Sequence, residues 1–548
     1  MSGTTHSDDT SRVPRFTFAG TLPEQRAHLE QNPLMARLRQ SRQALASDPY
    51  RPLCHFVSPE GRLNDPNGLC FWRGQWHLFY QAQPPDEPRW HWGHTVSEDL
   101  IHWRDLPYAI YPNPEEGCWS GSTWVEEDRV IAMYHGHLLG NMVAVSRDPL
   151  LLNWEKVTGT TVIPNVAPIW EKITGKEGRP RGSVFPVGAI NTVYDPCIWK
   201  KNGVYYSLSG GTIPHGPSGK RLRNAFLFRS TDLATWEYLH PFIEGDVFGL
   251  TGDDAACPYF WPLGDRHILI HFSHMSGSKY LIGDYDTARD TFTATAGGAF
   301  TFGAPSPSGV HAPSTTPDGR GGLVAMFNIN AGKPTPGWNQ IMSLPRRLTL
   351  ADNDELNIEP AGDIESLRHD HQTVAPMPLP ANREVVLEQI RGNAVELVME
   401  IDPKNAAMVE LNVLRSPGRE EYTRIVFFKR RGYRNWERCG DWGSKVAETT
   451  DSLITLDTSY SSELPDVASR APEIAPVYVK AGEPLKLRVF IDRSVVEVFV
   501  NGRQCVAVRA YPGRADSLGV SLRAQGQDAM LNRLDAWQLR SIWPSRAG

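Results

Sequence analysis

A short strand phrase occurs five times between residues 74 and 327, and this repeat limits the possible folds more than any other feature of the chain. Each copy starts at a Gly or Asp turn residue and continues as an alternating apolar run rich in aromatic side chains. The copies are Gly74–Tyr80, Asp128–Tyr134, Gly203–Leu208, Asp265–Phe272 and Gly322–Phe327, with starts 54, 75, 62 and 57 residues apart. This drifting period, with few helical patterns in between, predicts a β-propeller of five four-stranded blades. An ordinary multi-sheet protein with coincidental repeats is the alternative.

A second phrase is interleaved with the first. It reads Ser-x-Asp followed by a Trp, at Ser97–Trp103 and Ser230–Trp236, and more loosely from Ser146 to Trp154. Ser and Asp side chains suit a tight turn, and the Trp can clamp the neighbouring strand. The phrase therefore supports a repeated sheet unit.

The chain divides into four predicted segments. Residues 1–48 form an N-terminal extension with a helix over 22–47, packed on the outside of the propeller at 49–355. A polar, Pro-containing stretch at 356–384 is typical of a linker. Residues 385–543 alternate like strands, with a hairpin turning at Asp492-Arg493-Ser494, and predict a β-sandwich. The expected fold class is all-β: a five-bladed propeller followed by a sandwich.

Composition narrows the function classes. The net charge is −6 over 548 residues, which disfavours nucleic acid as a partner. No run of 18 apolar residues exists, and the N-terminus lacks the apolar region of a secretory signal. Seven cysteines are scattered without a CxxC pair, so we expect reduced thiols, no structural zinc and a cytoplasmic protein. We expect no membrane partner.

The richest chemistry lies between His55 and His94. The string Asn64-Asp65-Pro66-Asn67-Gly68 is a turn by composition, and a simple turn is one interpretation. Further along the same stretch follow Gln81, Trp90 and Trp92. A carboxylate beside amides can bond pairs of hydroxyls, and indoles stack on sugar rings. The stretch therefore favours a sugar-binding site.

Four ordered motifs carry a family resemblance. The stretch Arg51–Leu106, then Trp119-Ser120-Gly121-Ser122, then Gly337–Arg346, and the hairpin Phe490–Phe499 resemble glycoside hydrolase family 32, the invertases, inulinases and levanases. The resemblance covers about 50–543. It implies a five-bladed propeller plus β-sandwich, and retaining hydrolysis by a pair of carboxylates. This fold agrees with the one that the strand phrases predict.

The resemblance also implies roles for particular residues. Asp65 matches the family nucleophile, and Asp195 the carboxylate that stabilises the transition state. The residues that match the family's fructose pocket are Asn64, Gln81, Trp92 and Ser120, with Trp90 replacing another pocket Trp across a shortened loop.

Two positions depart from the family pattern. Tyr194 stands where the family has an arginine before Asp195, so a charged, bidentate fork is lost. Ala256, in Ala256-Cys257-Pro258, stands where the family has the glutamate that protonates the leaving group. In an extended segment Asp254 would share a face with position 256, so it is our candidate acid. Asp253 and Asp254 as turn caps are the alternative, and His271 and His274 are further candidate donors.

The sequence thus predicts a hydrolase for terminal β-fructofuranosidic linkages in sucrose or fructo-oligosaccharides, with a rearranged acid. Two other readings stay open: a fructosyl-transferring or anhydride-forming enzyme, and a sugar-binding protein without catalysis. The partner is a small carbohydrate in each case. No metal and no cofactor is implied. Oligomeric state is left open.

Overall fold

Strands make up almost all of the regular structure. The computed structural model describes residues 12–165, 192–213, 222–245, 253–351, 354–434 and 450–543. Within these ranges the helices are α1 (Leu22–Gln31), α2 (Pro33–Leu45) and the 3₁₀ turn η2 (Ile364–Leu367). The prediction of an all-β chain is confirmed. None of these helices has the length and apolar character needed to cross a bilayer.

The strands up to residue 360 form five sheets, each built from consecutive strands and mostly antiparallel. The first sheet contains β1 (Arg62–Trp72), β2 (Gln75–Gln83), β3 (His91–Ser97) and β4 (Arg104–Ile110). The second contains β5 (Cys118–Val125), β6 (Val130–Gly136), β7 (Gly140–Ser146), β8 (Glu155–Lys156) and β9 (Ile163–Pro164). The third contains β10 (Thr192–Lys201), β11 (Val204–Ile213), β12 (Leu222–Ser230) and β13 (Glu237–Pro241). The fourth contains β14 (Ile243–Glu244), β15 (Ala256–Leu263), β16 (Arg266–Ser273), β17 (Gly277–Asp286) and β18 (Thr291–Ala299). The fifth contains β19 (Val310–Pro317), β20 (Leu323–Ile329), β21 (Ile341–Met342), β22 (Arg346–Leu350) and β23 (Leu356–Pro360).

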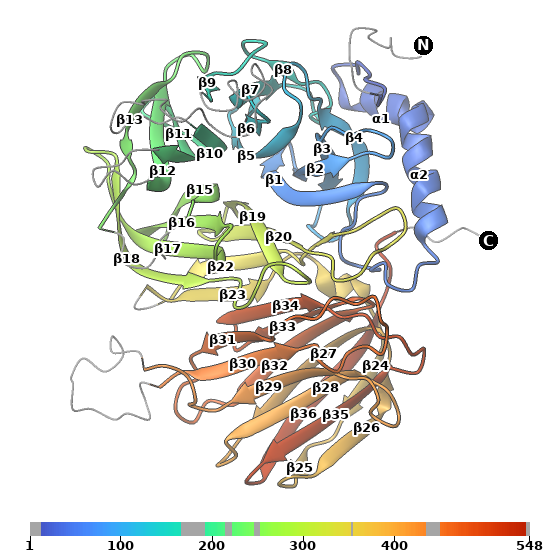
Figure 1. Cartoon of the computed structure of the whole chain (residues 1–548). Helices are drawn as coiled ribbons and strands as arrows, with labels where there is room; N and C mark the ends of the chain where they lie inside the picture. The colour runs from blue at the N-terminus through green and yellow to red at the C-terminus, as the bar shows by residue number, and fades with distance from the viewer. Residues whose placement is uncertain are drawn as a thin grey trace.

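The five sheets lie around a common centre (Figure 1). Their innermost strands β1, β5, β10, β15 and β19 contact one another in sequence order, and β19 contacts β1 again. This closed cycle is the arrangement of blades in a propeller. Counted from the centre, the first strands are therefore β1, β5, β10, β15 and β19, and β14 joins the fourth sheet at its outer edge beside β18.

The five strand phrases occupy the same place in every sheet. They correspond to β2, β6, β11, β16 and β20, each of which pairs with the innermost strand of its own sheet. The turn before the phrase demands a positive φ where glycine stands, as at Gly74 (φ 85°) and Gly203 (φ 82°). The repeat thus marks the hairpin between the first and second strands of each sheet.

The Ser-x-Asp phrase forms the turn after the third strand in three sheets. In each turn the serine Oγ bonds the carboxylate of the Asp two residues later, at 2.9 Å for Ser97, 3.2 Å for Ser146 and 3.0 Å for Ser230. Those carboxylates also accept backbone N–H bonds of the turn, for example from Ile101 at 2.9 Å and Ala234 at 2.9 Å. Side-chain bonds to the backbone make the turn self-contained, as the composition predicts.

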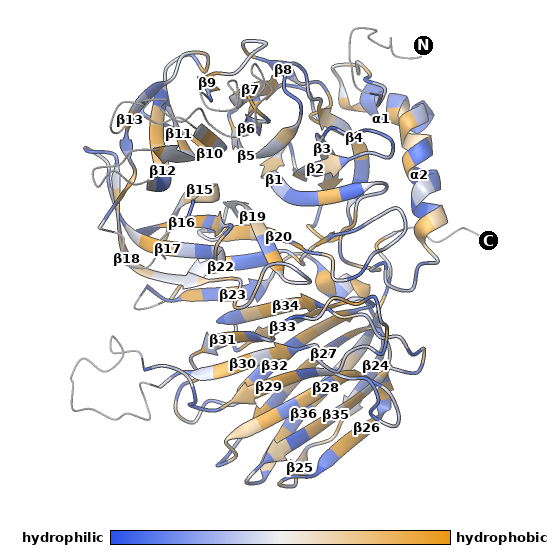
Figure 2. Cartoon of the chain, in the orientation of Figure 1, coloured by the Kyte–Doolittle hydropathy of each residue, from blue (hydrophilic) through white to orange (hydrophobic). Residues whose placement is uncertain are grey.

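Two sheets follow, and they pack face to face (Figure 1). One contains β24 (Arg368–Val374), β25 (Met377–Leu379), β27 (Ala394–Asp402), β32 (Leu485–Asp492), β33 (Val495–Val500), β34 (Gln504–Arg509) and β36 (Ala529–Leu539). The other contains β26 (Glu384–Arg391), β28 (Met408–Arg415), β29 (Thr423–Phe428), β30 (Ser452–Asp457), β31 (Glu473–Val477) and β35 (Gly519–Gln525). Apolar residues run along most of these strands (Figure 2). The predicted hairpin is β32–β33, closed by the pair Asp492–Val495.

Residues 356–384 differ from the predicted linker, since they form β23, η2, β24 and β25. The middle of β24 is exposed, because this strand lies at the edge of its sheet and has water beside it. Such a strand carries polar residues, and Pro378 is tolerated in β25, which pairs only with β36. Polar edge strands and linkers have the same composition, and composition was the basis of the prediction.

The N-terminal extension contains two helices where the sequence predicts one. Asn32 ends α1, and its side chain accepts hydrogen bonds from Leu34 N (2.9 Å) and Met35 N (3.3 Å) to start α2 at Pro33. An Asn cap followed by Pro is a strong start signal, which interrupts the first helix. The buried face of α2 packs beside β4 on the outside of the ring (Figure 1).

A buried ionic cluster joins the ring to the sandwich. His55 Nδ1 lies 2.9 Å from Asp492 Oδ2, and His55 Nε2 lies 3.2 Å from Glu497 Oε1. Arg346 donates to Glu497 Oε2 at 3.0 Å, and all these side chains are fully buried. Burial alone would lower the pKa of His55, but the two carboxylates outweigh it and raise that pKa to about 9. The hairpin β32–β33 is therefore fixed to the ring by a buried, charged contact.

Candidate active site

The candidate site lies where the five innermost strands begin. A cavity of about 390 Å³ opens there, and the side chains lining it come from all five sheets of the ring. The lining residues are Asn64, Asp65, Gln81, Trp119, Ser120, His135, His137, Tyr194, Asp195, Thr212, Arg223, Asp254, His274 and His311. Carboxylates, amides and imidazoles from the five sheets therefore surround one space.

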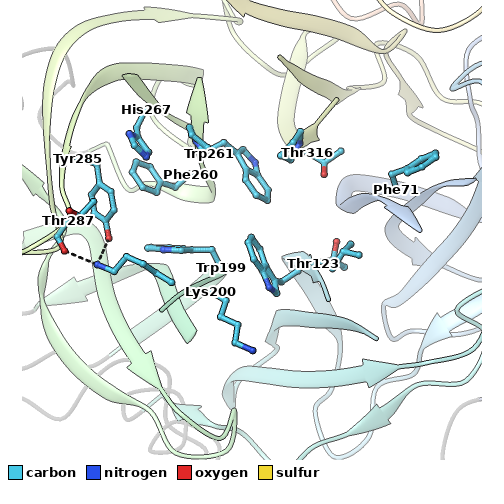
Figure 3. A pocket seen from close by; sticks show the side chains of 15 residues that line it. Phe71, Thr123, Trp199, Lys200, Phe260, Trp261, His267, Tyr285, Thr287 and Thr316 are labelled. Carbon is cyan, nitrogen blue, oxygen red and sulfur yellow. Dashed lines mark hydrogen bonds between the residues drawn. The ribbon is translucent and has the colours of Figure 1, made fainter. Parts of the chain in front are cut away.

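The same strands end at a second cavity of about 580 Å³ (Figure 3). Trp199, Phe260 and Trp261 line it, and the indoles of Trp124 and Trp261 stack with ring centres 6.2 Å apart. Its described lining contains no carboxylate, whereas the first cavity contains three. Acid–base chemistry on a sugar therefore belongs to the first cavity.

An irregularity in strand pairing changes the direction of the first side chains of each innermost strand. Register shifts occur at the start of β1, β5, β10, β15 and β19. Prolines follow the shifts in four of the strands, at Pro66, Pro196, Pro258 and Pro313, and Gly121 takes that place in β5. Bulges redirect side chains, and proline is tolerated at them because no ladder donor is needed. In β1, β5 and β10 the two residues before the proline or Gly121 line the first cavity, and in β19 His311 does. In β15 the corresponding residues, Ala256 and Cys257, are buried beside it.

Asp65 is held as an anion. Its Oδ2 accepts hydrogen bonds from Ser120 Oγ (2.6 Å) and Gln81 Nε2 (3.2 Å), and its Oδ1 lies 3.1 Å from His311 Nδ1. The residue is only 7 % exposed. Burial would raise the pKa of Asp65, but the interaction with His311 and the Ser120 bond outweigh it, so the pKa lies below its usual value. An ionised carboxylate in a polar cradle suits a nucleophile.

Amides fix the floor beside Asp65. Asn64 donates to Gln81 Oε1 at 2.8 Å, and its own carbonyl accepts from Gln340 (3.0 Å) and Asn328 (3.3 Å). Gln81 also donates to Ser120 Oγ at 2.7 Å. The structure therefore brings Asn64, Gln81 and Ser120 together around Asp65, as the resemblance implies.

Asp195 faces the same space from β10. The φ angle of Asp195 is +44°, a strained conformation for a non-glycine residue. The residue lies at the bulge of β10. Cys257 is shared between the two carboxylates: its Sγ lies 3.6 Å from Asp195 Oδ2 and 3.7 Å from Asp65 Oδ2. His135 Nδ1 lies 3.7 Å from Asp195 Oδ1. The two family carboxylates thus lie on either side of one buried thiol.

The two departures from the family have specific surroundings. Ala256 is fully buried and packs with Cys257, Phe272 and Ala312. Tyr194 lines the cavity and donates from its hydroxyl to the backbone carbonyl of Asp254 at 2.9 Å. Burial first, then the charges of Asp254 and Asp195, raise the pKa of Tyr194. Position 256 supplies no proton, and Tyr194 ties β10 to the segment before β15.

Asp254 reaches the cavity, but its surroundings are those of an ionised group. Both carboxylate oxygens accept from His274: Oδ1 from the backbone N at 3.1 Å, and Oδ2 from Nδ1 at 2.8 Å. Burial would raise the pKa of Asp254, yet His274, together with Arg223 at 3.8 Å, lowers it. The assignment of Asp254 as the acid stays a prediction, and this lowered pKa argues that it does not donate the proton itself. The adjacent Asp253 lies outside the cavity lining, bonded to Ser273 (2.7 Å), Ser276 (2.6 Å) and Lys279 (2.8 Å).

Three predicted side chains lie elsewhere. Trp92 is fully buried between the first two sheets and donates to the Trp119 carbonyl at 2.8 Å, so it supports the cavity wall without lining it. Trp90 packs behind Trp119, with ring centres 5.5 Å apart. His271 is buried in β16. The pocket tryptophan of the described lining is Trp119, which the Trp-Ser-Gly-Ser motif contains.

The structure adds residues that sequence reasoning missed. His311 stands two positions before Pro313, at the place in β19 that Asn64 has in β1. That proline pattern was a usable signal. No motif marks the others: His135, Thr212 and Arg223 come from second and third strands, and His137 from the turn after β6.

Known proteins are similar to this chain over nearly its whole length. Residues 55–360 match the N-terminal domain of the glycosyl hydrolases family 32, and residues 363–538 match the C-terminal domain of that family. The sucrose-6-phosphate hydrolase of Escherichia coli is 27 % identical, over 94 % of this chain and 100 % of the relative. The fructan 6-exohydrolase of Beta vulgaris is 25 % identical, over 90 % of this chain and 87 % of the relative. The structure of fructan 1-exohydrolase IIa from Cichorium intybus in complex with 1-kestose is similar with a TM-score of 0.74 at 22 % identity, covering 90 % of this chain and 98 % of that one.

Proposed function

The chain belongs to family 32 of the glycosyl hydrolases, and from this premise we propose that it hydrolyses terminal β-fructofuranosidic linkages in sucrose or fructo-oligosaccharides with retention. The similarity to proteins named for sucrose-6-phosphate and fructan hydrolysis supports this substrate class. The likeness to a chain solved with 1-kestose shows the shared fold.

One observation carries the proposal. Asp65 and Asp195 face a single cavity from neighbouring parts of the ring, with the Cys257 thiol within 3.7 Å of one and 3.6 Å of the other. In retaining glycosidases one carboxylate attacks the anomeric carbon and forms a covalent glycosyl-enzyme. A binding protein needs hydrogen-bond acceptors but has no need for a carboxylate held ionised in this position.

The family resemblance implies the roles, and the arrangement of the side chains supports them. Asp65 attacks the anomeric carbon. Asp195 binds ring hydroxyls whose bonds strengthen as positive charge develops on the sugar. Asn64, Gln81 and Ser120 hold Asp65 and can share the sugar hydroxyls, Tyr194 borders the same subsite, and Trp119 offers an apolar face for stacking. Asp254 belongs to the acid side of the site through its contact with His274.

A cytoplasmic location is part of the proposal. Cys54, Cys70, Cys118, Cys197, Cys257 and Cys505 are all free and buried, while Cys439 lies outside the described residues. Free thiols in this number suit a reducing compartment.

Release of free fructose tests the function. The purified protein should liberate fructose from sucrose or 1-kestose, and Asp65→Ala should lose about 10⁴-fold or more in kcat/KM while keeping its melting temperature within a few degrees. Analysis of products at high sugar concentration detects longer fructosides if transfer competes with hydrolysis. Binding of 1-kestose without any product would contradict the proposal.

A further inference from the structure

Breaking a glycosidic bond near neutral pH requires a proton on the departing oxygen. The inference developed here rests on the proposed function and concerns the source of that proton. Ala256 has no exchangeable hydrogen in its side chain. The described cavity lining offers these ionisable groups: Asp65, Asp195, Asp254, Tyr194, Arg223, His135, His137, His274 and His311.

Four of these groups are poor donors near neutral pH. The pKa values of Asp65 and Asp254 lie below their usual range, so both are ionised. The Tyr194 hydroxyl already donates to the Asp254 carbonyl, and burial raises its pKa. The guanidinium of Arg223 lies 3.8 Å from Asp254 Oδ2, and a guanidinium is too weak an acid to protonate a leaving group. Asp195 is assigned above to the ring hydroxyls, which leaves the four imidazoles as candidate donors.

Three of the four imidazoles have other partners. His311 Nδ1 faces Asp65 Oδ1 at 3.1 Å, where it supports the nucleophile. His135 Nδ1 faces Asp195 Oδ1 at 3.7 Å. His137 Nδ1 accepts a hydrogen bond from the Trp119 indole at 2.5 Å. The fourth, His274, is also bound at Nδ1, but its partner Asp254 is neither the nucleophile nor the stabilising carboxylate.

The position of His274 suits a residue that delivers a proton into the cavity. It stands in the turn between β16 and β17, lines the cavity, and its side chain is 63 % exposed. The ionised Asp254 can only accept, so Nδ1 of His274 carries a hydrogen towards it at 2.8 Å. The second bond, from the His274 backbone N to Oδ1 at 3.1 Å, fixes the turn on the same carboxylate. Within the described part of the chain, Nε2 has no hydrogen-bond partner and is left for a ligand.

The local charges favour the protonated ring. The hydrogen bond to Asp254 raises the pKa of His274, burial opposes it, and the charges of Asp254, Asp195 and Asp65 raise it further. A histidine that is protonated near neutral pH is well matched to general acid catalysis. The other charged or titratable groups facing this assembly are Arg223, His135, His137, His311 and Tyr194.

We propose that His274 is the general acid and base of the reaction and that Asp254 is its positioning residue. In the first step an Asp65 oxygen bonds to the anomeric carbon, the bond from that carbon to the glycosidic oxygen breaks, and the proton on His274 Nε2 passes to the leaving oxygen. In the second step neutral Nε2 takes a proton from water, whose oxygen bonds to the anomeric carbon. Asp65 leaves as a carboxylate, and the imidazolium is restored.

Two substrates separate an acid from a merely structural residue. Sucrose or 1-kestose needs a protonated leaving group, whereas β-fructofuranosyl fluoride does not. We expect His274→Ala to lose about 10²–10⁴-fold in kcat/KM on the glycosides, and to lose less than about tenfold in the fluoride-release step. Added imidazole should restore part of the glycoside activity.

The chain provides a matched control. His102 also sits in a turn with its Nδ1 on an aspartate, 2.6 Å from Asp99 Oδ2, and its side chain is 45 % exposed outside the cavity lining. His102→Ala should keep full activity on both substrates. Asp254→Asn should lower the pKa of His274 and move the basic limb of the glycoside pH profile about one unit or more towards acid. A structural role alone would not move that limb.

Equal losses of His274→Ala on glycoside and fluoride, or glycoside activity within threefold of the parent, would overturn the assignment. Cleavage of the fluoride but of neither glycoside by the parent would overturn it too. A parent that cleaves none of the three substrates would instead overturn the proposed function itself.

Discussion

The Nδ1 atom of His311 lies 3.1 Å from Oδ1 of Asp65, a contact that joins the last sheet of the ring to the first at the cavity floor. The His311 ring also packs on Phe272 of the fourth sheet, with ring centres 4.1 Å apart. The side chain that lowers the pKa of the candidate nucleophile thus comes from the sheet that closes the ring.

Replacing His311 should change the pH dependence more than the fold. The interaction with His311 lowers the pKa of Asp65, so His311→Ala should raise that pKa and move the acidic limb of kcat/KM to higher pH. The sign follows because the nucleophile must be ionised. A pH profile on β-fructofuranosyl fluoride, which isolates the first step, measures this limb. An unchanged limb would show that His311 does not act on Asp65.

The cluster at His55 predicts how stability depends on pH. The pKa of His55 is raised to about 9 in the folded protein, above its unfolded value of about 6.5. Its contribution to the free energy of unfolding is therefore complete below about pH 6.5 and is lost as the pH rises through about 9. Melting temperatures from pH 6 to 10 should fall in the upper part of this range for the parent.

Removing one partner of the same cluster should be costly. Asp492→Asn removes one of the two carboxylates that face the buried His55 imidazole, and breaking a buried ion pair costs about 3–5 kcal/mol of unfolding free energy. Urea unfolding at pH 7 measures the loss. Asp370→Asn is the matched control, because Asp370 faces His369 at 2.8 Å on the surface, where its side chain is 73 % exposed. Equal stability of the two variants would contradict the role of the cluster in joining ring and sandwich.

Restoring the family glutamate should not help this protein. Ala256 is fully buried among Cys257, Phe272 and Ala312, so Ala256→Glu must displace packed side chains next to two carboxylates. We expect a lower melting temperature and no gain in kcat/KM on sucrose. Ala256→Gln, of similar volume, separates crowding from charge. A rise in sucrose hydrolysis with glutamate alone would mean that the parent lacks a working acid.

Much of the ring could be predicted because its repeat is local. Each hairpin between first and second strands needs a turn residue and an apolar alternation, and both are visible in the printed sequence, as at Asp265–Phe272. The polar edge strand β24 could not be separated from a linker, since exposure to water gives both the same residues. The break between α1 and α2 was visible at Asn32-Pro33 and was overlooked.

The candidate site could also be predicted from the sequence only in part. Asp65, Asp195, Asn64, Gln81 and Ser120 stand in motifs, and the structure places all five in one cavity. Trp92, which the family resemblance implies for the fructose pocket, is fully buried between sheets and is absent from the cavity lining, because a motif match does not reveal which face of the strand its side chain occupies. His274 and Asp254 meet only because a turn between β16 and β17 folds back on the segment before β15. No spacing in the sequence encodes that contact.

The anomer formed in methanol tests the central claim most directly. Methanol competes with water for the fructosyl group, and the methyl fructofuranoside that forms does not mutarotate. If Asp65 forms a covalent intermediate, NMR of the products from sucrose in dilute methanol shows methyl β-fructofuranoside, because two inversions give retention. Methyl α-fructofuranoside as the first product would contradict a nucleophilic role for Asp65.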